Sequence, residues 1–132
     1  MGRRLILDMN VLIGYERGSL DRSTFDEDDL AVAALSIAEY RVGIELADSM
    51  ARAADRARAL VAITSAVDVL PYTEGTAAHH ARLLAHVRRS GTPRGAHDLI
   101  VAAHALETDR IVVSRDAAAH FSDLPGVAAV QV

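Results

Sequence analysis

The chain has 132 residues and a formal net charge of −4 at pH 7, so its length predicts one domain over residues 1–132. About half of its residues are hydrophobic, but no apolar run approaches the roughly 18 residues that cross a bilayer. We therefore expect a soluble, cytoplasmic protein with no membrane partner. Cysteine is absent and all 14 basic residues are arginine, which excludes disulfides, thiolate metal sites and every mechanism that needs a lysine.

The first predicted strand, residues 4–7, is an apolar run that ends abruptly in an acid, Asp8. Its composition suits a strand buried on both faces of a parallel sheet. Asn10 suits the start of a helix over residues 11–16. Asp8 is therefore expected at the carboxyl end of a strand, where open α/β sheets bind ligands.

Next along the chain, the acidic run 26–29 is interpreted as a solvated turn, and the apolar run 30–34 as a short strand. Ser36 is expected to open a helix that runs to about residue 48. Glu39 lies three residues after Ser36, which is the spacing of a capping box.

The central part of the chain is predicted to be mainly helical. Ser49 is expected to cap a helix over 51–65, and residues 67–71 form a short strand that stops at a proline. An amphipathic helix over 73–89 and a turn-rich break follow. The next helix, 96–107, is apolar almost all round and is therefore expected to be buried.

The C-terminal part continues the alternation of predicted strands and helices. Residues 110–114 are predicted to form a strand, Asp116 leads a short helix over 117–121, and a turn at 124–126 precedes a last strand over 127–130. Strands that alternate with helices predict an α/β fold, with a parallel sheet of four to five strands and helices on both faces.

Four carboxylates are expected along one edge of this sheet: Asp8, Glu39, Asp98 and Asp116. Each has an innocent explanation, such as a turn, a helix cap or a favourable position in the helix dipole. Together they favour a functional site.

Asp98 is the most informative of the four acids. It shares a face of the buried helix with Val101 and Ala102. A buried, unpaired charge costs several kcal/mol, so the carboxylate needs a cation or a firm hydrogen-bonding partner. A hard divalent cation, Mg²⁺ or Mn²⁺, would neutralise several carboxylates at once. The residues therefore predict an acidic metal site.

Each of the four acids lies in a short sequence motif, and the four motifs follow one another along the chain. They are Asp8-x-Asn10, Ser36-x-x-Glu39-x-x-x-Gly43, His97-Asp98 and Ser114-Arg115-Asp116. The ordered set resembles the PIN-domain nucleases and, within them, the VapC-type toxins of bacterial toxin–antitoxin pairs. The resemblance covers nearly the whole chain.

This resemblance implies a three-layer PIN-like fold and a metal-dependent endoribonuclease that cuts cellular RNA. It implies that the four acids hold Mg²⁺ or Mn²⁺, and that Asn10 and Ser114 orient these acids or hold the metal's waters. It also implies a small cognate antitoxin as partner and a homodimer. Arg115, Arg94 and Arg41 lie nearest to the acids in sequence, so they are candidates to hold RNA phosphates.

Two departures from the family pattern stand out. Met9 occupies a position where the family usually has a small residue, commonly Thr or Ser. Residues 117–119 are alanines where some members supply a further acid, so the number of metal ions stays open.

Other features allow several explanations. His97 is interpreted as a hydrogen-bonded structural histidine, and Gly43 inside a helix predicts close packing of that face, since glycine there costs about 1 kcal/mol. Two alternatives to a nuclease stay open. One is a non-catalytic PIN-fold binding protein, and the other is a haloacid-dehalogenase-like phosphatase, which Asp8-Met9-Asn10 loosely resembles.

Overall fold

A computed structural model describes residues 2–116 and 119–132 and shows an α/β fold built on a fully parallel sheet. Within these residues the sheet has five strands in the order β3-β2-β1-β4-β5. This confirms the predicted fold class. The strands are β1 (Arg4–Leu7), β2 (Asp29–Ala33), β3 (Asp68–Leu70), β4 (Ile111–Ser114) and β5 (Ala129–Gln131).

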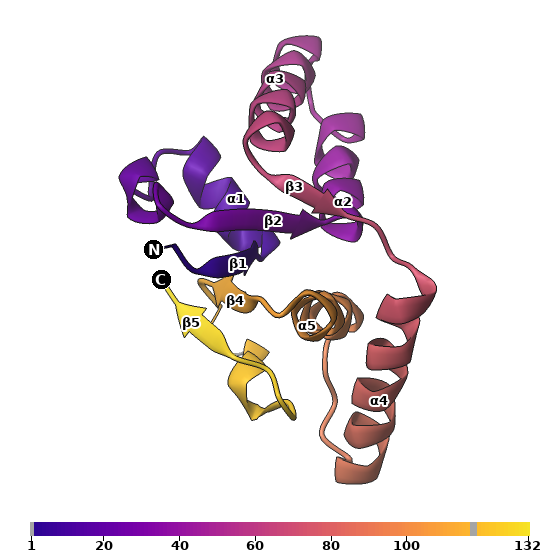
Figure 1. Cartoon of the computed structure of the whole chain (residues 1–132). Coiled ribbons are helices and arrows are strands. Elements are labelled where there is room, and N and C mark those ends of the chain that lie inside the picture. The colour runs from indigo at the N-terminus through magenta and orange to yellow at the C-terminus, as the bar shows by residue number, and fades with distance from the viewer. Residues whose placement is uncertain (1, 117–118) are drawn as a thin grey trace.

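The helices lie on both faces of the sheet (Figure 1). They are α1 (Met9–Glu16), α2 (Ala34–Glu45), α3 (Met50–Ala66), α4 (Glu74–Ser90) and α5 (Ala96–Thr108), with 3-10 segments η1 (Arg22–Phe25) and η3 (Phe121–Asp123). In Figure 1 the strands run from β3 near the top to β5 at the lower left; α1, α2 and α3 pack on one face of the sheet, and α4 and α5 pack on the other. No helix in the described part of the chain is both long and apolar enough to cross a membrane.

The central strand β1 divides the core into two halves. Leu5 and Leu7 pack with α1 and η1, whereas Ile6 packs with α5, and all three side chains are buried. Alternate residues of a strand point to opposite faces, so a continuous apolar run is what a strand covered on both sides requires. The strand is also fixed in register by parallel pairing to β2 and β4.

The starts of two helices differ from the prediction. Helix α1 begins at Met9, and Asp8 caps it by accepting a hydrogen bond from the Met9 backbone N–H at 2.8 Å, so the expectation that Asn10 starts the helix is wrong. Helix α2 begins at Ala34, and Ser36 is buried inside it. The predicted capping box is therefore also wrong, and Glu39 lies in the second turn of α2.

The later elements agree more closely with the prediction. Ser49 caps α3, its hydroxyl accepting from the backbone N–H of Arg52 at 3.1 Å. Helix α5 begins at residue 96 and is largely buried, as expected. The helix predicted over 117–121 lies partly outside the described residues, and Phe121 begins η3 instead.

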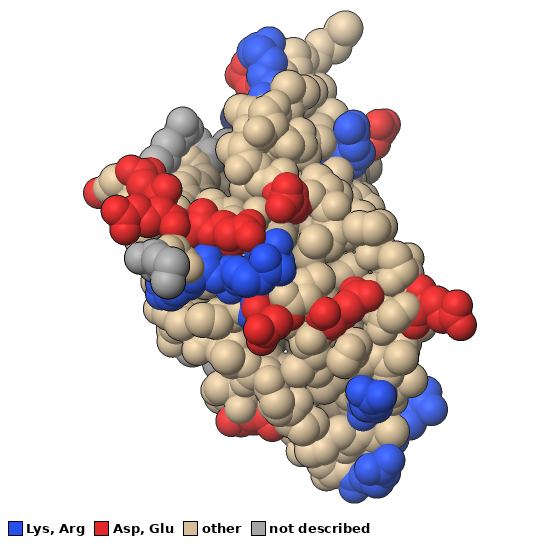
Figure 2. Space-filling model, in the orientation of Figure 1, with Lys and Arg blue, Asp and Glu red and all other residues tan. Residues whose placement is uncertain are grey.

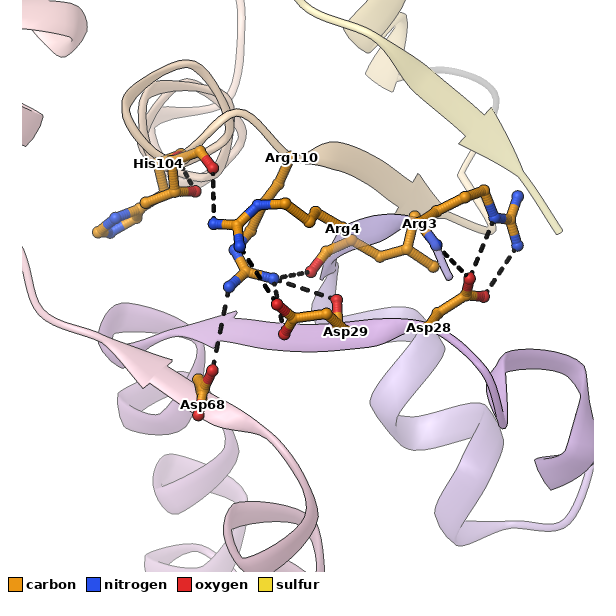
Figure 3. Close-up of polar contacts among 9 residues, drawn as sticks. Arg3, Arg4, Asp28, Asp29, Asp68, His104 and Arg110 are labelled. Carbon is orange, nitrogen blue, oxygen red and sulfur yellow. Dashed lines mark hydrogen bonds and ion pairs between the residues drawn. The ribbon is translucent and has the colours of Figure 1, made fainter. Parts of the chain in front are cut away.

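The amino edge of the sheet is held by charged groups. The guanidinium of Arg110, whose side chain is 4% exposed, donates from Nη1 to the carbonyls of Leu5 and Asp29, both at 3.1 Å. It also forms an ion pair with the Asp29 carboxylate at 3.3 Å and approaches Asp68 at 4.0 Å (Figure 3). These contacts join the beginnings of β1, β2 and β3 to β4.

The acidic run 26–29 takes part in this edge. Asp28 accepts from the backbone and the guanidinium of Arg3, and Arg4 pairs with Asp29. The hydrogen bonds from Arg3 hold the pKa of Asp28 below its usual range. On the face drawn in Figure 2, acidic and basic side chains lie against one another in one band. The interpretation of the whole run as a solvated turn is therefore wrong for its last two residues.

We predict that Arg110→Met lowers the free energy of unfolding by about 2–4 kcal/mol. Methionine keeps much of the buried volume but leaves the Leu5 and Asp29 carbonyls without their donor. Urea unfolding measures the difference, with the exposed Arg88→Met as control, expected within about 0.5 kcal/mol of the parent. A loss no larger than that of the control would contradict the structural role of Arg110.

Candidate metal centre

Asp8 is fixed at the carboxyl edge of the sheet by backbone contacts on both sides. Its own N–H donates to the Val113 carbonyl of β4 at 2.9 Å, and its carboxylate Oδ1 accepts from the Met9 N–H. The half-buried carboxylate therefore stands at the N-terminus of α1, where it caps the helix.

A polar network links Asp8 to the turn after β4. The hydroxyl of Ser114 donates to Asp8 Oδ2 at 3.0 Å, and the side-chain amide of Asn10 donates to the same oxygen at 3.3 Å. Asn10 Oδ1 accepts from the backbone N–H of Arg115, and Ser114 Oγ accepts from that of Asp116, both at 3.0 Å. Asn10 and Ser114 thus orient the Asp8 carboxylate and the chain that carries Asp116.

Asp98 brings the four predicted acids into one electrostatic cluster. It lies in the first turn of α5 and is half-buried. Burial raises the pKa of Asp98, and the charges of Asp8, Asp116 and Glu39 raise it further, while His97 opposes them. Acids from three other parts of the chain are therefore close enough to Asp98 to disfavour its charge.

Glu39 reaches this cluster from α2 and meets a histidine. His97 Nδ1 lies 2.8 Å from Glu39 Oε1, and the two side chains are 42% and 38% exposed. His97 is therefore hydrogen-bonded, as expected, and its partner is one of the predicted site acids. Among the described residues, no arginine forms an ion pair with Asp8, Glu39 or Asp98.

Two glycines near the acids differ in their packing. A Cβ at Gly95 would lie 3.2 Å from Asp98 Oδ2, so glycine there leaves room for the carboxylate. A Cβ at Gly43 would meet only Arg56 Nη1, at 3.9 Å, which is an ordinary contact. The expectation that close packing explains Gly43 is therefore wrong.

The donor chemistry of the acidic cluster fits a hard divalent cation. Its groups are carboxylates, the ligands that Mg²⁺ and Mn²⁺ take in proteins. Over residues 2–116 and 119–132, no three histidine, aspartate or glutamate side chains stand together as a ready-made ligand set. Because Mg²⁺ keeps several waters and often uses only one or two carboxylates, the cluster remains suited to it by charge and donor type.

The arginines selected from sequence have different surroundings. Arg94 is 13% exposed on its side chain, and its Nη1 donates to the carbonyls of Ala119 and His120, which ties down that segment. Arg115 donates to Ser19 Oγ at 2.7 Å, and Arg41 is exposed. Arg94 is therefore engaged in the fold, which makes it the least available of the three for a ligand.

Sequence reasoning missed a second group of arginines beside the acids. An open cavity of about 370 Å³ is lined by Met9 and Glu39 and also by Arg17, Arg52 and Arg56. These arginines come from the end of α1 and from α3. The four-residue spacing of Arg52 and Arg56 was the available signal, but it is equally typical of a solvated helix face.

Comparison with known proteins gives consistent matches along the chain. The model of the PIN domain family matches residues 5–126. Ribonuclease VapC5 from Mycobacterium tuberculosis is 32% identical over 127 residues, which cover 96% of this chain and 92% of that protein.

Solved structures of toxin–antitoxin systems share the fold. A chain of VapBC-5 from Mycobacterium tuberculosis matches with a TM-score of 0.77 and 28% identity, covering 98% of this chain and 97% of that one. A chain of VapBC2 from Rickettsia felis, solved with a fragment of promoter DNA, matches with a TM-score of 0.85 and 15% identity over 98% of both chains. The second match concerns the fold alone.

We predict that Asp98→Asn stabilises the protein at neutral pH when divalent cations are chelated. The folded-state pKa of Asp98 is raised, so its charged form costs the native state stability at neutral pH. The gain is up to about 1 kcal/mol once solvent screening is allowed for. It shrinks as the pH falls through the raised pKa, where the native state binds a proton before the unfolded state does.

Thermal unfolding in EDTA, from neutral pH down through the raised pKa of Asp98, measures the difference in stability between Asp98→Asn and the parent. Asp26→Asn, at an exposed acid outside the cluster, is the matched control and is expected to show no such pH dependence. If Asp98→Asn were no more stable than the parent at neutral pH, the mutual repulsion of the four acids would be refuted.

Proposed function

Because this chain belongs to the PIN-domain family and is of the VapC type, we propose that it is a hydrolase, a divalent-metal-dependent endoribonuclease that acts as a toxin on cellular RNA. The relative named above is a ribonuclease by its name. The observation that carries the proposal is the gathering of three further carboxylates around half-buried Asp98.

The distribution of charge supports a bound divalent cation. Asp98 has three acidic neighbours and one opposing histidine, so a cation would remove the repulsion that now raises its pKa. Asp8, Glu39, Asp98 and Asp116 are the proposed ligands, used through a subset of their oxygens. Mg²⁺ or Mn²⁺ bound there would lower the pKa of a water and stabilise charge on the leaving oxygen of a phosphodiester.

The chain's own residues prepare this chemistry. Ser114 and Asn10 hold Oδ2 of Asp8 in one orientation, and the Met9 N–H holds Oδ1. His97 does the same for Oε1 of Glu39. Such partners hold carboxylates in one orientation, and their loss typically weakens metal binding by 10- to 100-fold.

The partners and location follow as part of the proposal. Several similar structures are complexes of a toxin with its antitoxin, so we infer a small cognate antitoxin that binds over the acidic edge. A homodimer and a cytoplasmic site of action are proposed from the same family. Residues 1–132 are proposed to act as a single PIN domain.

We predict that the purified protein cuts RNA with Mn²⁺ or Mg²⁺ and that EDTA abolishes cleavage. Asp8→Asn and Asp98→Asn should each lower the rate by at least about 100-fold, since each removes a charged donor from the proposed metal centre. Cleavage of a labelled RNA on a denaturing gel provides the measurement.

Asp26→Asn is the control and should cut like the parent, because its exposed side chain lies outside the acidic cluster. No cleavage by the parent, together with no binding of Mn²⁺, would overturn the proposal in favour of a non-catalytic PIN-fold binding protein. Hydrolysis of a generic monophosphate that depends on Asp8, with RNA left intact, would instead favour the phosphatase.

A further inference from the structure

The cavity beside Glu39 differs in charge from the acidic cluster that it adjoins. It occupies about 370 Å³ between α1, α2 and α3, and we call it the arginine cavity after Arg17, Arg52 and Arg56. Glu39 and Met9 line it on the side of the acids. A polymer bound at the acids therefore has an adjoining space lined by three guanidinium groups.

Each of the three arginines has a different degree of restraint. Arg56 Nη1 donates to the Gly43 carbonyl at 2.5 Å, which fixes that side chain against the cavity wall. Arg52 is 65% exposed, and its one ion pair among the described residues is with exposed Asp48 at 3.4 Å, a contact of little net strength. Arg17 is exposed, and its side chain has no hydrogen-bond or ion-pair partner among the described residues.

The remaining lining offsets this positive charge only in part, because Glu39 and Asp55 set two carboxylates against three guanidinium groups. Asp55 also lines the cavity, but it pairs with Arg58, which stands outside the lining. Gly43 leaves the wall open, because a Cβ built there would have only Arg56 Nη1 within 4 Å. The cavity therefore has both the charge and the space for an anionic group.

We propose that the arginine cavity binds a backbone phosphate of the RNA strand, next to the phosphodiester held at the acids. The inference rests on the proposed function and names the residues that position its substrate. A guanidinium matches a phosphate through paired N–H donors, and arginine is the side chain best suited to this geometry. RNA is favoured over an acidic peptide because a strand that is cleaved at the acids has further phosphates on either side of the cleaved bond. These phosphates must lie close to the acids, and the arginine cavity adjoins Glu39.

The test measures how RNA binding depends on salt. A labelled ten-nucleotide single-stranded RNA is titrated with protein carrying Asp98→Asn, which prevents cleavage, in a series of salt concentrations. Each phosphate contact on a single strand contributes about 0.7 to the slope of log affinity against log salt. Adding Arg17→Gln and Arg52→Gln removes the one proposed phosphate contact, so it should reduce the slope by about 0.7 and the affinity at low salt by about tenfold or more.

Two further variants separate charge from fold. Arg88→Gln with Arg89→Gln removes two exposed arginines from the far end of α4 and should leave the slope unchanged. Arg17→Lys with Arg52→Lys keeps the charge and should retain most of the slope. In the cleavage-competent chain, the double glutamine variant should raise KM about tenfold and leave kcat nearly unchanged.

The outcomes distinguish this inference from the proposed function. If the parent cuts RNA but the double glutamine variant keeps the parental slope and KM, the arginine cavity does not bind the substrate. If that variant loses affinity for an oligoglutamate peptide while its RNA affinity stays intact, the cavity binds an acidic protein segment and the inference is overturned. Failure of the parent to cut any RNA would count against the proposed function, whereas the slope would still report on the cavity.

Discussion

The crowding of three other carboxylates around Asp98 is the constraint on which the rest of this structure depends. Burial and three acidic neighbours raise the pKa of Asp98, so the folded chain holds charge together against its own repulsion. The parallel sheet makes this possible, because β1 and β4 are paired and both end at the same edge. Asp8 and Asp116 follow these two strands, while Glu39 and Asp98 arrive on α2 and α5.

Charged side chains have opposite roles at the two edges of the sheet. At the amino edge, Arg110 is buried and bonded to the beginnings of β1 and β2, so its charge stabilises the fold. At the carboxyl edge, hydrogen bonds from Ser114 and Asn10 orient Asp8 without bringing a compensating positive charge. This contrast explains why the arginine at one edge stabilises the fold, whereas the acids at the other edge are left for the cation that we propose.

Much of the fold could be predicted from sequence because its signals are local. The apolar run 4–7 predicts a buried strand, and the almost wholly apolar segment 96–107 predicts a buried helix. Both predictions agree with the structure. The start of α2 could not be predicted, because Ser36 has the spacing of a cap but is buried by packing. The ion pair between Arg110 and Asp29 joins residues 81 positions apart, and no local sequence pattern predicts it.

The candidate site also has residues that could be predicted from the sequence and residues that could not. Asp8 and Asp98 could be selected because an acid after a buried strand, or on an apolar helix face, needs an explanation. The roles of the arginines could not, since Arg94 is engaged by carbonyls of a distant segment and the arginine cavity forms only when α3 packs beside α2. Sequence proximity to the acids was therefore a poor guide to which guanidinium groups remain available.

The most direct test of this account is a crystal structure of the protein soaked with Mn²⁺, with the metal located by its anomalous scattering. The account predicts a peak between Asp8 and Asp98, with the Ser114 and Asn10 contacts to Asp8 preserved. A soaked crystal with manganese bound only elsewhere, or with the four carboxylates turned apart and no peak among them, would contradict it.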